Sequence, residues 1–430
     1  MSARPPYYRR NFVAFLGDYT GFALALTFAS STTVLPDFVS QLTDSKVLIG
    51  LLTTATTGAW LLPQLAFANL LTNKRRKKPY VIMGALFGRP FYLLYAAALA
   101  LGLYRHPMLA FYLFAAVQII FFASDALAAV AWFDVMGKAM SEEQRGRLIG
   151  RAQFVSGVLS IGAGLLIAAL LSKDGPSYPY NYAIILALSG VFLLLSLLSW
   201  TFVVEPDEAV QEQRPAWRDY VPHLLNTLRQ DHALTRLLAV RLLAGADGLV
   251  LGFYILFATQ ELGLPPETVG IFTAAQTAGR IVSSVGLGTL CERRGSHRVI
   301  QAATLINLSA PLVGLALLLT GAQAGTATTV IYAWVYLAIS VVMSSGMLGY
   351  YNYVLELAPP GERPTYIGLF NTISGVLIVL PTVGGWLLQT TSYGVLFALT
   401  AGVLIIAHGL SWSLPAPHRA APLSQAEPAS

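Results

Sequence analysis

Long apolar segments without a charged side chain recur along this sequence, each with the length of a membrane helix. Residues 109–123 and 183–204, for example, contain no Lys, Arg, Asp or Glu. A bilayer core about 30 Å thick needs roughly 20 apolar residues per helix. Charged residues make up only 11% of the 430 residues, whereas soluble domains carry about 25%. We therefore expect an all-α integral membrane protein embedded in the lipid bilayer.

The apolar segments divide into six helices, a polar stretch and six more helices. The expected transmembrane helices span residues 11–35, 47–71, 79–103, 108–136, 148–172, 182–204, 235–260, 267–290, 299–320, 329–357, 366–389 and 393–413. The expected organisation is an N-terminus (1–10), an N-terminal six-helix bundle (11–204), a linker (205–234), a C-terminal six-helix bundle (235–413) and a tail (414–430). A helical part is expected in the linker at 217–228. The tail is rich in Pro, Ala and Ser, and we expect it to be disordered.

Basic residues lie mainly in alternate loops, and this bias sets the orientation of membrane helices. With the N-terminus inside, the cytoplasmic segments contain Arg4, Arg9, Arg10, Lys74 to Lys78, Lys138, Arg145, Arg147, Arg214, Arg218, Arg229, Arg236, Arg293, Arg294, Arg298, Arg363 and Arg419. The outer loops contain only Lys46, Arg105 and Lys173. We therefore expect both termini in the cytoplasm and the chain in the plasma (inner) membrane. The net charge of +6 then reflects topology and gives no reason to expect nucleic-acid binding.

The two halves of the chain are related by a repeat. A shift of 218 residues places 145–159 on 363–377, with seven of fifteen positions identical. The identities include Arg145 with Arg363 and a shared Ser-Gly-Val-Leu run. The shift spans six helices, an even number, so the halves point the same way and are related by an axis along the membrane normal.

Loop motifs give a resemblance to a known family. The segment 288–298, Gly-Thr-Leu-Cys-Glu-Arg-Arg-Gly-Ser-His-Arg, resembles the loop signature of the major facilitator superfamily. Its first-half counterpart, 69–78, keeps the basic run but lacks the leading Gly and the acidic residue. The loops at 142–147 and 361–363 resemble the second basic loop of that family.

This resemblance covers about residues 11–413 and implies two pseudo-symmetric six-helix bundles with a central substrate site. It also implies alternating access, in which the bundles rock about that site. The first, second, fourth and fifth helices of each half would line the site, and the third and sixth would lie at the periphery.

Charged side chains within membrane helices are expensive, at roughly 2.5–3.5 kcal/mol each on insertion scales. Asp247 and Arg280 lie near the middle of the seventh and eighth helices, at similar depth. We expect them to form a buried pair that binds substrate or couples to protons. The alternative is a structural ion pair that joins the two helices.

Three further residues are candidates for substrate binding or proton coupling. Asp125 lies in the fourth helix, and a desolvated carboxylate there can carry a proton near neutral pH. Otherwise it bonds to neighbours such as Ser124 or to Arg89, for which a bond between helices is favoured over a substrate role. Asp18 and Arg241 lie in the inner thirds of the first and seventh helices, where gate contacts or water are equally plausible.

A second group lies nearer the cytoplasmic surface. Asp134 and Arg151 are expected to form a gate network with Arg145 and Arg147 that holds one conformation closed. Glu292 and Arg363, in the matching loops of the second half, are further gate candidates.

Uncharged polar and aromatic residues on the cavity helices complete the candidate set. They are Trp60, Gln64, Gln276, Tyr350, Asn352 and Asn371. Such side chains could hold a sugar-like, amphipathic or aromatic solute. The alternative is bonding between helices and aromatic belts at the membrane interface.

No sequence motif for an enzyme, a metal site or a nucleotide site is present. The six His residues are scattered, and the single cysteine, Cys291, excludes an intramolecular disulfide. We expect no cofactor, no metal and no enzymatic activity, and a monomer. Without a nucleotide-binding loop, any active transport must use solute or ion gradients.

The sequence therefore predicts a secondary active transporter for a small organic solute, with protons as a candidate coupling ion. Export is slightly favoured, because the midplane lacks the several basic residues that an anion importer would need. Two rivals are an ion-independent facilitator and a non-transport role such as a lipid scramblase or a sensor.

Overall fold

The computed structural model describes residues 7–72, 74–206, 228, 230–359 and 362–416. These residues form helices and their connections, with no strand among them. Most of the expected linker, including its helical part at 217–228, lies outside the described residues, as do residues 1–6 of the N-terminus and most of the tail.

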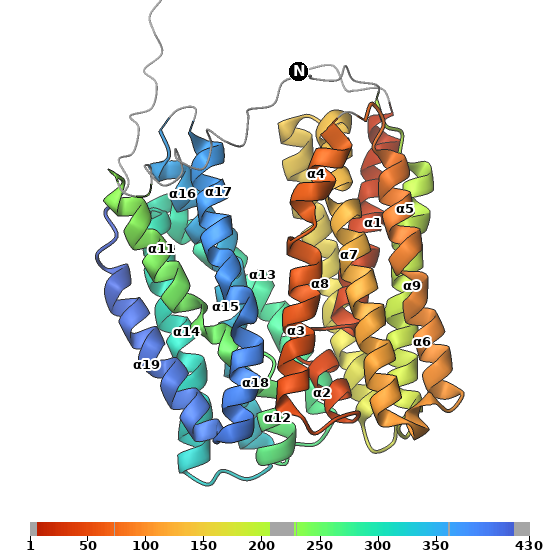
Figure 1. Ribbon diagram of the computed structural model, residues 1–430, viewed down its shortest axis with the longest axis vertical. Helices are drawn as coiled ribbons and strands as arrows, with labels where there is room; N and C mark the ends of the chain where they lie inside the picture. The colour runs from red at the N-terminus through yellow and green to blue at the C-terminus, as the bar shows by residue number, and fades with distance from the viewer. Residues whose placement is uncertain (1–6, 73, 207–227, 229, 360–361, 417–430) are drawn as a thin grey trace, which may run out of the picture.

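The first half of the chain forms one bundle, drawn red to yellow-green in Figure 1. Its helices are α1 (Tyr8–Phe28), α2 (Val34–Ser40), α3 (Lys46–Leu61), α4 (Gln64–Thr72), α5 (Lys78–Gly88), α6 (Pro90–Ala100), η1 (Leu103–Arg105), α7 (Pro107–Ala139), α8 (Glu142–Leu171) and α9 (Tyr180–Phe202). Within this bundle α1 packs on α8 and α9, α5 packs on α7, and α6 packs on α9.

The second half forms the other bundle, drawn green to blue. Its helices are α11 (His232–Ala244), η2 (Gly245–Leu249), α12 (Tyr254–Leu256), η3 (Phe257–Glu261), α13 (Thr268–Arg294), α14 (Ser296–Leu319), α15 (Thr326–Ser345), η4 (Gly346–Tyr351), α16 (Asn352–Leu357), α17 (Arg363–Ser374), η5 (Gly375–Val379), α18 (Leu380–Thr390) and α19 (Tyr393–Ser411). Here α14 packs on α15 and α19, and α13 packs on α15.

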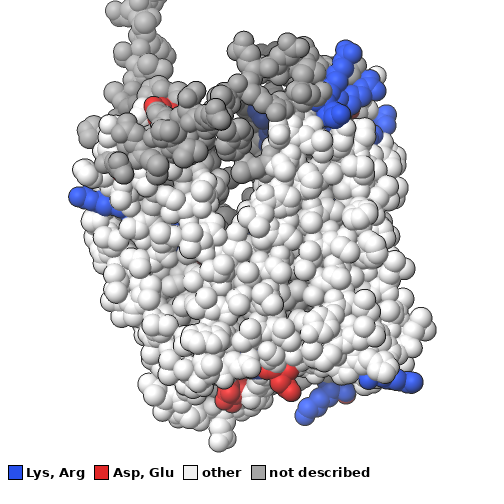
Figure 2. All heavy atoms as spheres, viewed as in Figure 1, with Lys and Arg blue, Asp and Glu red and all other residues white. Residues whose placement is uncertain are grey.

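Eleven segments of the described chain are long and apolar enough to span a membrane. They correspond to eleven of the twelve expected helices; the largest difference is at the first, which ends at Phe28 rather than at residue 35. The remaining expected helix is α13, which is 27 residues long but carries Gln276, Arg280 and several hydroxyl side chains. Figure 2 shows a broad band nearly free of charge between the two charged ends of the molecule. The expected all-helical membrane architecture is therefore confirmed.

Several expected single helices are interrupted. The second breaks before Pro63 and the third at Pro90, where a proline removes a backbone donor. The first and the seventh break at 29–33 and 245–253, positions related by the same shift as the repeat. Pro36, which we expected to lie beyond a helix, is inside the short α2.

Candidate functional site

The two bundles are bonded together at one end of the molecule, which we call the closed end; it contains residues 32–46 and 257–276. Between α1 and α2, Thr32 Oγ1 donates to Gln276 Oε1 at 2.8 Å. The hydroxyls of Thr33 and Thr273 share a hydrogen bond of 2.7 Å. At the start of α3, Lys46 Nζ donates to Gln260 Oε1 at 2.6 Å. Each of these bonds joins an N-terminal residue to a C-terminal one, so together they form a seam between the halves.

Helices α3 and α18 continue this seam. Thr382 Oγ1 donates to Thr54 Oγ1 at 2.7 Å, and Thr54 Oγ1 donates to the carbonyl of Ile378 at 3.0 Å. A Cβ on Gly50 would lie 2.1 Å from the carbonyl oxygen of Pro381. The backbones are therefore so close that only glycine fits at position 50.

Glycines on α8 and α13 show where the halves separate. A Cβ on Gly164 would lie within 3.0 Å of Ala274, and one on Gly157 within 3.0 Å of Ile281. The same antiparallel register continues to Gly150 opposite Gly288, but there a Cβ on either glycine would meet no atom within 4 Å. Among the described residues, α8 and α13 are thus in tight contact toward the closed end and lie further apart at this glycine pair, two turns further on. Figure 2 shows a hollow between the bundles in this part of the molecule. We call this end, which also contains Lys77, Asp134 and Glu205, the open end.

A buried network of charges lies within the N-terminal bundle. The guanidinium of Arg89, at the junction of α5 and α6, donates from Nη1 to Ser196 Oγ at 2.8 Å, and its Nη2 lies 3.7 Å from Asp125 Oδ1 on α7. Ser196 Oγ in turn donates to Asp18 Oδ1 on α1 at 2.5 Å. Asp18, Arg89 and Asp125 are each at most 9% exposed. The expected bond from Arg89 to another helix is confirmed, and Arg89 is the partner of Asp125.

Two tryptophans bring indole N–H donors to this network. Trp132 Nε1 donates to Asp18 Oδ2 at 2.6 Å. Trp60, near the end of α3, lies beside the Asp125 carboxylate. Two carboxylates therefore share one guanidinium and two indoles. With both carboxylates ionised the network carries one net negative charge, so it can accept one proton or another monovalent cation without gaining a net positive charge.

The expected ion pair between Asp247 and Arg280 is wrong. Arg241 is the cation that acts on Asp247, and the Asp247 carboxylate also accepts from backbone N–H groups of its own turn, η2. The equal depth of two residues did not determine which way their helices face. Asp247 lies in η2, the turn that follows α11, and α13 presents Ile281 to Gly157 of the other bundle.

Arg280 faces the N-terminal bundle instead. Arg280 is exposed, and Tyr19 on α1 is the group that acts on it electrostatically. Among the described residues, its guanidinium makes no hydrogen bond and no ion pair.

The remaining cavity candidates differ in their contacts. Gln276 is bonded in the seam. Arg241 lies over the ring of Tyr350 at 5.4 Å. Tyr351 Oη donates to Asn371 Oδ1 at 2.6 Å, and Asn352 Nδ2 donates to its own helix at 3.3 Å. The amide nitrogen of Gln64 is buried without a hydrogen-bond partner among the described residues.

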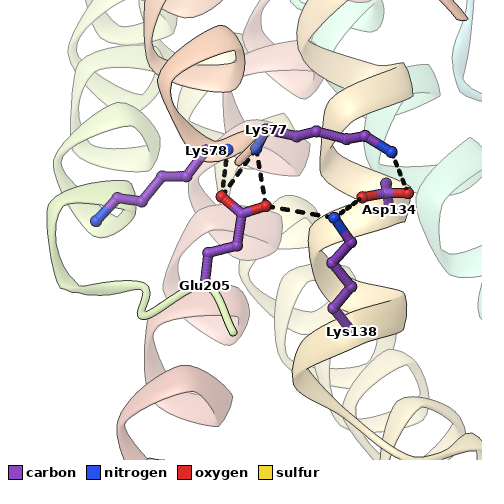
Figure 3. Close-up of polar contacts among 5 residues, drawn as sticks. All are labelled: Lys77, Lys78, Asp134, Lys138 and Glu205. Carbon is purple, nitrogen blue, oxygen red and sulfur yellow. Dashed lines mark hydrogen bonds and ion pairs between the residues drawn. The ribbon is translucent and has the colours of Figure 1, made fainter. Parts of the chain in front are cut away.

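A second polar network lies at the open end of the N-terminal bundle, and Figure 3 shows its five residues. The carboxylate of Glu205, just after α9, accepts from the backbone N–H groups of Lys77 at 2.8 Å and Lys78 at 2.8 Å, and so caps α5. Lys77 Nζ lies 2.6 Å from Asp134 Oδ1. Lys138 Nζ lies 2.8 Å from Asp134 Oδ2 and 3.7 Å from Glu205. The network therefore joins α5, α7 and the end of α9 within one bundle.

The expected gate contacts of Asp134 with Arg147 and Arg151 are wrong, because Asp134 pairs with Lys77 and Lys138. Arg147 pairs with Glu143 on its own helix at 2.9 Å, and Arg151 lies over the ring of Phe12 at 5.6 Å. Arg145 Nη1 lies against Gly137 of α7. Glu292 and Arg363 are exposed at the open end, at the end of α13 and the start of α17.

Sequence reasoning missed one buried carboxylate, Asp37 on α2. Tyr182 Oη donates a short hydrogen bond to it, and Thr259 Oγ1 of the other bundle donates to Asp37 Oδ1 at 3.3 Å. Its position directly after Pro36 made it look like a loop residue. The described residues contain no cluster of three or more His, Cys, Asp or Glu side chains that could hold a metal ion.

Comparison with known proteins places these features in a family. A family model described as the Major Facilitator Superfamily matches residues 19–380 and 237–429. A mutant of the nucleoside transporter NupG is similar with a TM-score of 0.69, 12% identity and coverage of 95% of this chain and 99% of that one. A bacterial homologue of the iron transporter ferroportin, in an inward-facing state, gives a TM-score of 0.69, 14% identity and coverage of 96% and 99%. The xylose transporter XylE from E. coli, in an inward-open conformation, gives 0.65, 12%, and 95% and 96%. No curated protein matches the chain.

Proposed function

The chain belongs to the Major Facilitator Superfamily, a family of membrane transporters, and from this premise we propose that it is a secondary active transporter working by alternating access. It is an integral membrane protein of a family that moves small molecules across membranes. The proposal adds that the two bundles rock about a central site, that the open end faces the cytoplasm with both termini, and that the protein works as a monomer in the plasma (inner) membrane.

The contrast along α8 and α13 carries this proposal. One continuous register changes from backbone contact at Gly164 to open space at Gly150 and Gly288. Small residues allow membrane helices to approach closely, so these glycines could also pack if the bundles rocked the other way. The glycines at the open end then serve a conformation different from the one described here.

Proton coupling through the Asp18–Arg89–Asp125 network is the second part of the proposal. Asp125 lies 3.7 Å from the Arg89 guanidinium, and Asp18 is linked to it through the Ser196 hydroxyl. Buried carboxylates that share a charge partner in this way are candidates for proton exchange. Trp60 on α3 lies beside Asp125, and Trp132 on α7 donates to Asp18. Movement of these helices would change the hydrogen bonds that the two carboxylates accept.

A transport assay tests both parts. Purified full-length protein is reconstituted into vesicles containing a pH dye, and neutral sugars, nucleosides, amino acids and monocarboxylates are added one at a time. We expect one class to drive proton movement, which should disappear in Asp125→Asn and in Asp18→Asn. Acidification of the lumen after solute is added outside indicates symport, and alkalinisation indicates antiport. With an inward proton gradient, symport corresponds to import and antiport to the slightly favoured export.

The controls separate the rivals. Solute uptake that continues without proton movement in the wild type would identify an ion-independent facilitator. Lipid flipping in the same vesicles, with no uptake of any solute, would instead favour a scramblase and contradict the proposal. Glu143→Gln, which removes an exposed pair with Arg147 on one helix, serves as a charge-changing control that should transport normally.

A further inference from the structure

Arg280 is the one described basic side chain in the middle of a membrane helix for which the structure provides no partner. The other mid-helix basic residues have partners. Arg89 is bonded to Ser196, and Arg241 lies over Tyr350 beside Asp247. An unpaired charge at this depth is costly unless water or a ligand reaches it. We therefore expect water or a ligand to reach the Arg280 guanidinium.

The faces of α13 show where Arg280 points. Gly279, one residue earlier, packs against Ser340 of α15, and Ile281, one residue later, packs against Gly157 of α8. Val282 and Val285 are 72% and 68% exposed on the far side, where lipid lies. Because residues three and four apart share a helix face, Arg280 lies on the same face as Thr273 and Gln276, toward the other bundle rather than toward lipid.

The seam ends immediately before Arg280. Thr273 bonds to Thr33, and Gln276, one turn further, bonds to Thr32. One more turn along the same face is Arg280, where no bond crosses between the bundles and Tyr19 lies opposite. The guanidinium thus lies at the base of the space that opens between the halves.

From this geometry we infer that Arg280 is the substrate-binding cation and that the transported solute is a small organic monocarboxylate. The inference rests on the proposed transport function and names its substrate class. A guanidinium presents a planar fork of donors that matches a carboxylate bidentately. Tyr19 provides a phenol beside the same position. Arg89 is already shared by Asp18 and Asp125, so Arg280 is the cation that remains to face a solute. One guanidinium balances one negative charge, and a dianion such as a phosphate ester would leave one charge uncompensated.

A thermal-unfolding experiment tests the substrate class. The full chain in detergent is heated at constant ionic strength with acetate, lactate or benzoate, with the matched amides, with succinate, and with methyl phosphate. Binding to the folded state alone raises the unfolding temperature. We expect at least one monocarboxylate to stabilise the wild type and its amide to have no effect. Arg280→Gln should weaken that affinity by about 10- to 100-fold, the range for one charge-assisted hydrogen bond.

Two variants make this result specific. Arg280→Lys keeps the charge but loses the planar fork, so we expect an intermediate loss; it also serves as the test if Arg280→Gln does not fold. Arg105→Gln removes an exposed Arg of the outer loop η1 and should leave binding unchanged. The inference is overturned if no monocarboxylate stabilises the wild type, if Arg280→Gln and Arg280→Lys both bind as well as the wild type, or if only methyl phosphate or succinate binds.

The two proposals fail in different ways. Monocarboxylate binding that depends on Arg280, without uptake into vesicles, would contradict the transport proposal and leave the anion site in place. Uptake of a neutral solute that is unaffected by Arg280→Gln would support transport and overturn the anion assignment.

Discussion

The two bundles differ in how their mid-membrane charges are paired and in which of their helices are interrupted. In the N-terminal bundle Asp18, Arg89 and Asp125 are joined in one network, α7 and α8 are continuous, and the second and third helices break near Pro63 and at Pro90. In the C-terminal bundle α13 and α14 are continuous, the helices equivalent to α7 and α8 are interrupted at η4 and η5, and the Arg280 guanidinium has no hydrogen bond or ion pair among the described residues. The N-terminal bundle therefore satisfies its mid-membrane charges internally, whereas the C-terminal bundle leaves one cation unpaired beside the other half.

The largest expected effect comes from deleting the cation of the paired bundle. Arg89→Ala leaves Asp18 and Asp125 buried without their shared partner, and breaking a buried pair in this way costs about 3–5 kcal/mol. Arg280→Gln should cost no more than about 0.5 kcal/mol, as for substitutions away from buried contacts. The two variants are compared by thermal unfolding in detergent. Equal losses of stability would end the distinction between the bundles.

A double variant sharpens that result. Adding Asp125→Asn to Arg89→Ala removes one of the two unpaired carboxylates, so part of the lost stability should return. The coupling energy between two residues in contact is typically about 0.5–3 kcal/mol. Additive losses in the double-mutant cycle would show that Arg89 and Asp125 do not interact.

The next effect concerns the seam between α3 and α18. Gly50→Ala places a Cβ 2.1 Å from the Pro381 carbonyl, which the closed end cannot accommodate. The population should therefore shift toward a state with this end open. In a Cys291→Ser background, labelling of Thr273→Cys by an impermeant maleimide should become faster. The matched control is Gly402→Ala on α19, whose Cβ meets no atom within 4 Å; labelling at an unchanged rate in both variants would contradict the description of the seam.

A smaller effect is expected at the open end of the N-terminal bundle. Glu205→Gln keeps the shape of the side chain but removes the charge that caps α5, and hydrogen bonds to charged groups are worth about 1.5–3 kcal/mol. Glu143→Gln, in an exposed pair, should change stability by no more than about 1 kcal/mol. Thermal unfolding of the two variants measures the difference. If the two losses are the same, the capping role is wrong.

The smallest effect is the loss of one seam bond. Thr33→Val removes the hydroxyl that bonds Thr273 but keeps the side-chain shape, and one neutral hydrogen bond contributes about 0.5–1.5 kcal/mol. The described state should lose that much stability, which thermal unfolding in detergent measures as a small decrease in unfolding temperature. An unchanged or raised unfolding temperature would contradict the role of this bond.

The sequence predicted the helices and the family because a membrane restricts which residues can lie within it and which can lie in its loops. The family resemblance read from the loop at 288–298 is confirmed by the family model, and eleven of the twelve expected helices correspond to segments that can span a membrane. Arg89 as a partner for Asp125 was also foreseen as one alternative. These features depend on residues whose chemical type alone restricts where they can lie.

The rest depended on helix rotation and on contacts between distant segments. Asp247 and Arg280 share a depth but face different directions, and depth is all that a hydropathy pattern provides. Glu205 reaches Lys77 across 128 residues, and no local pattern specifies that contact. Asp37 was missed because its sequence position at a helix end resembles a solvated loop.

Cysteine cross-linking tests the central claim, that the two bundles alternate between two closures. In a Cys291→Ser background, one variant carries Thr33→Cys with Thr273→Cys at the closed end. A second carries Gly150→Cys with Gly288→Cys at the open end. We expect each pair to cross-link in native membranes. In a variant with all four cysteines, cross-linking of the first pair should prevent that of the second. Cross-linking of only the closed-end pair, under all conditions, would show a single rigid arrangement and contradict the account.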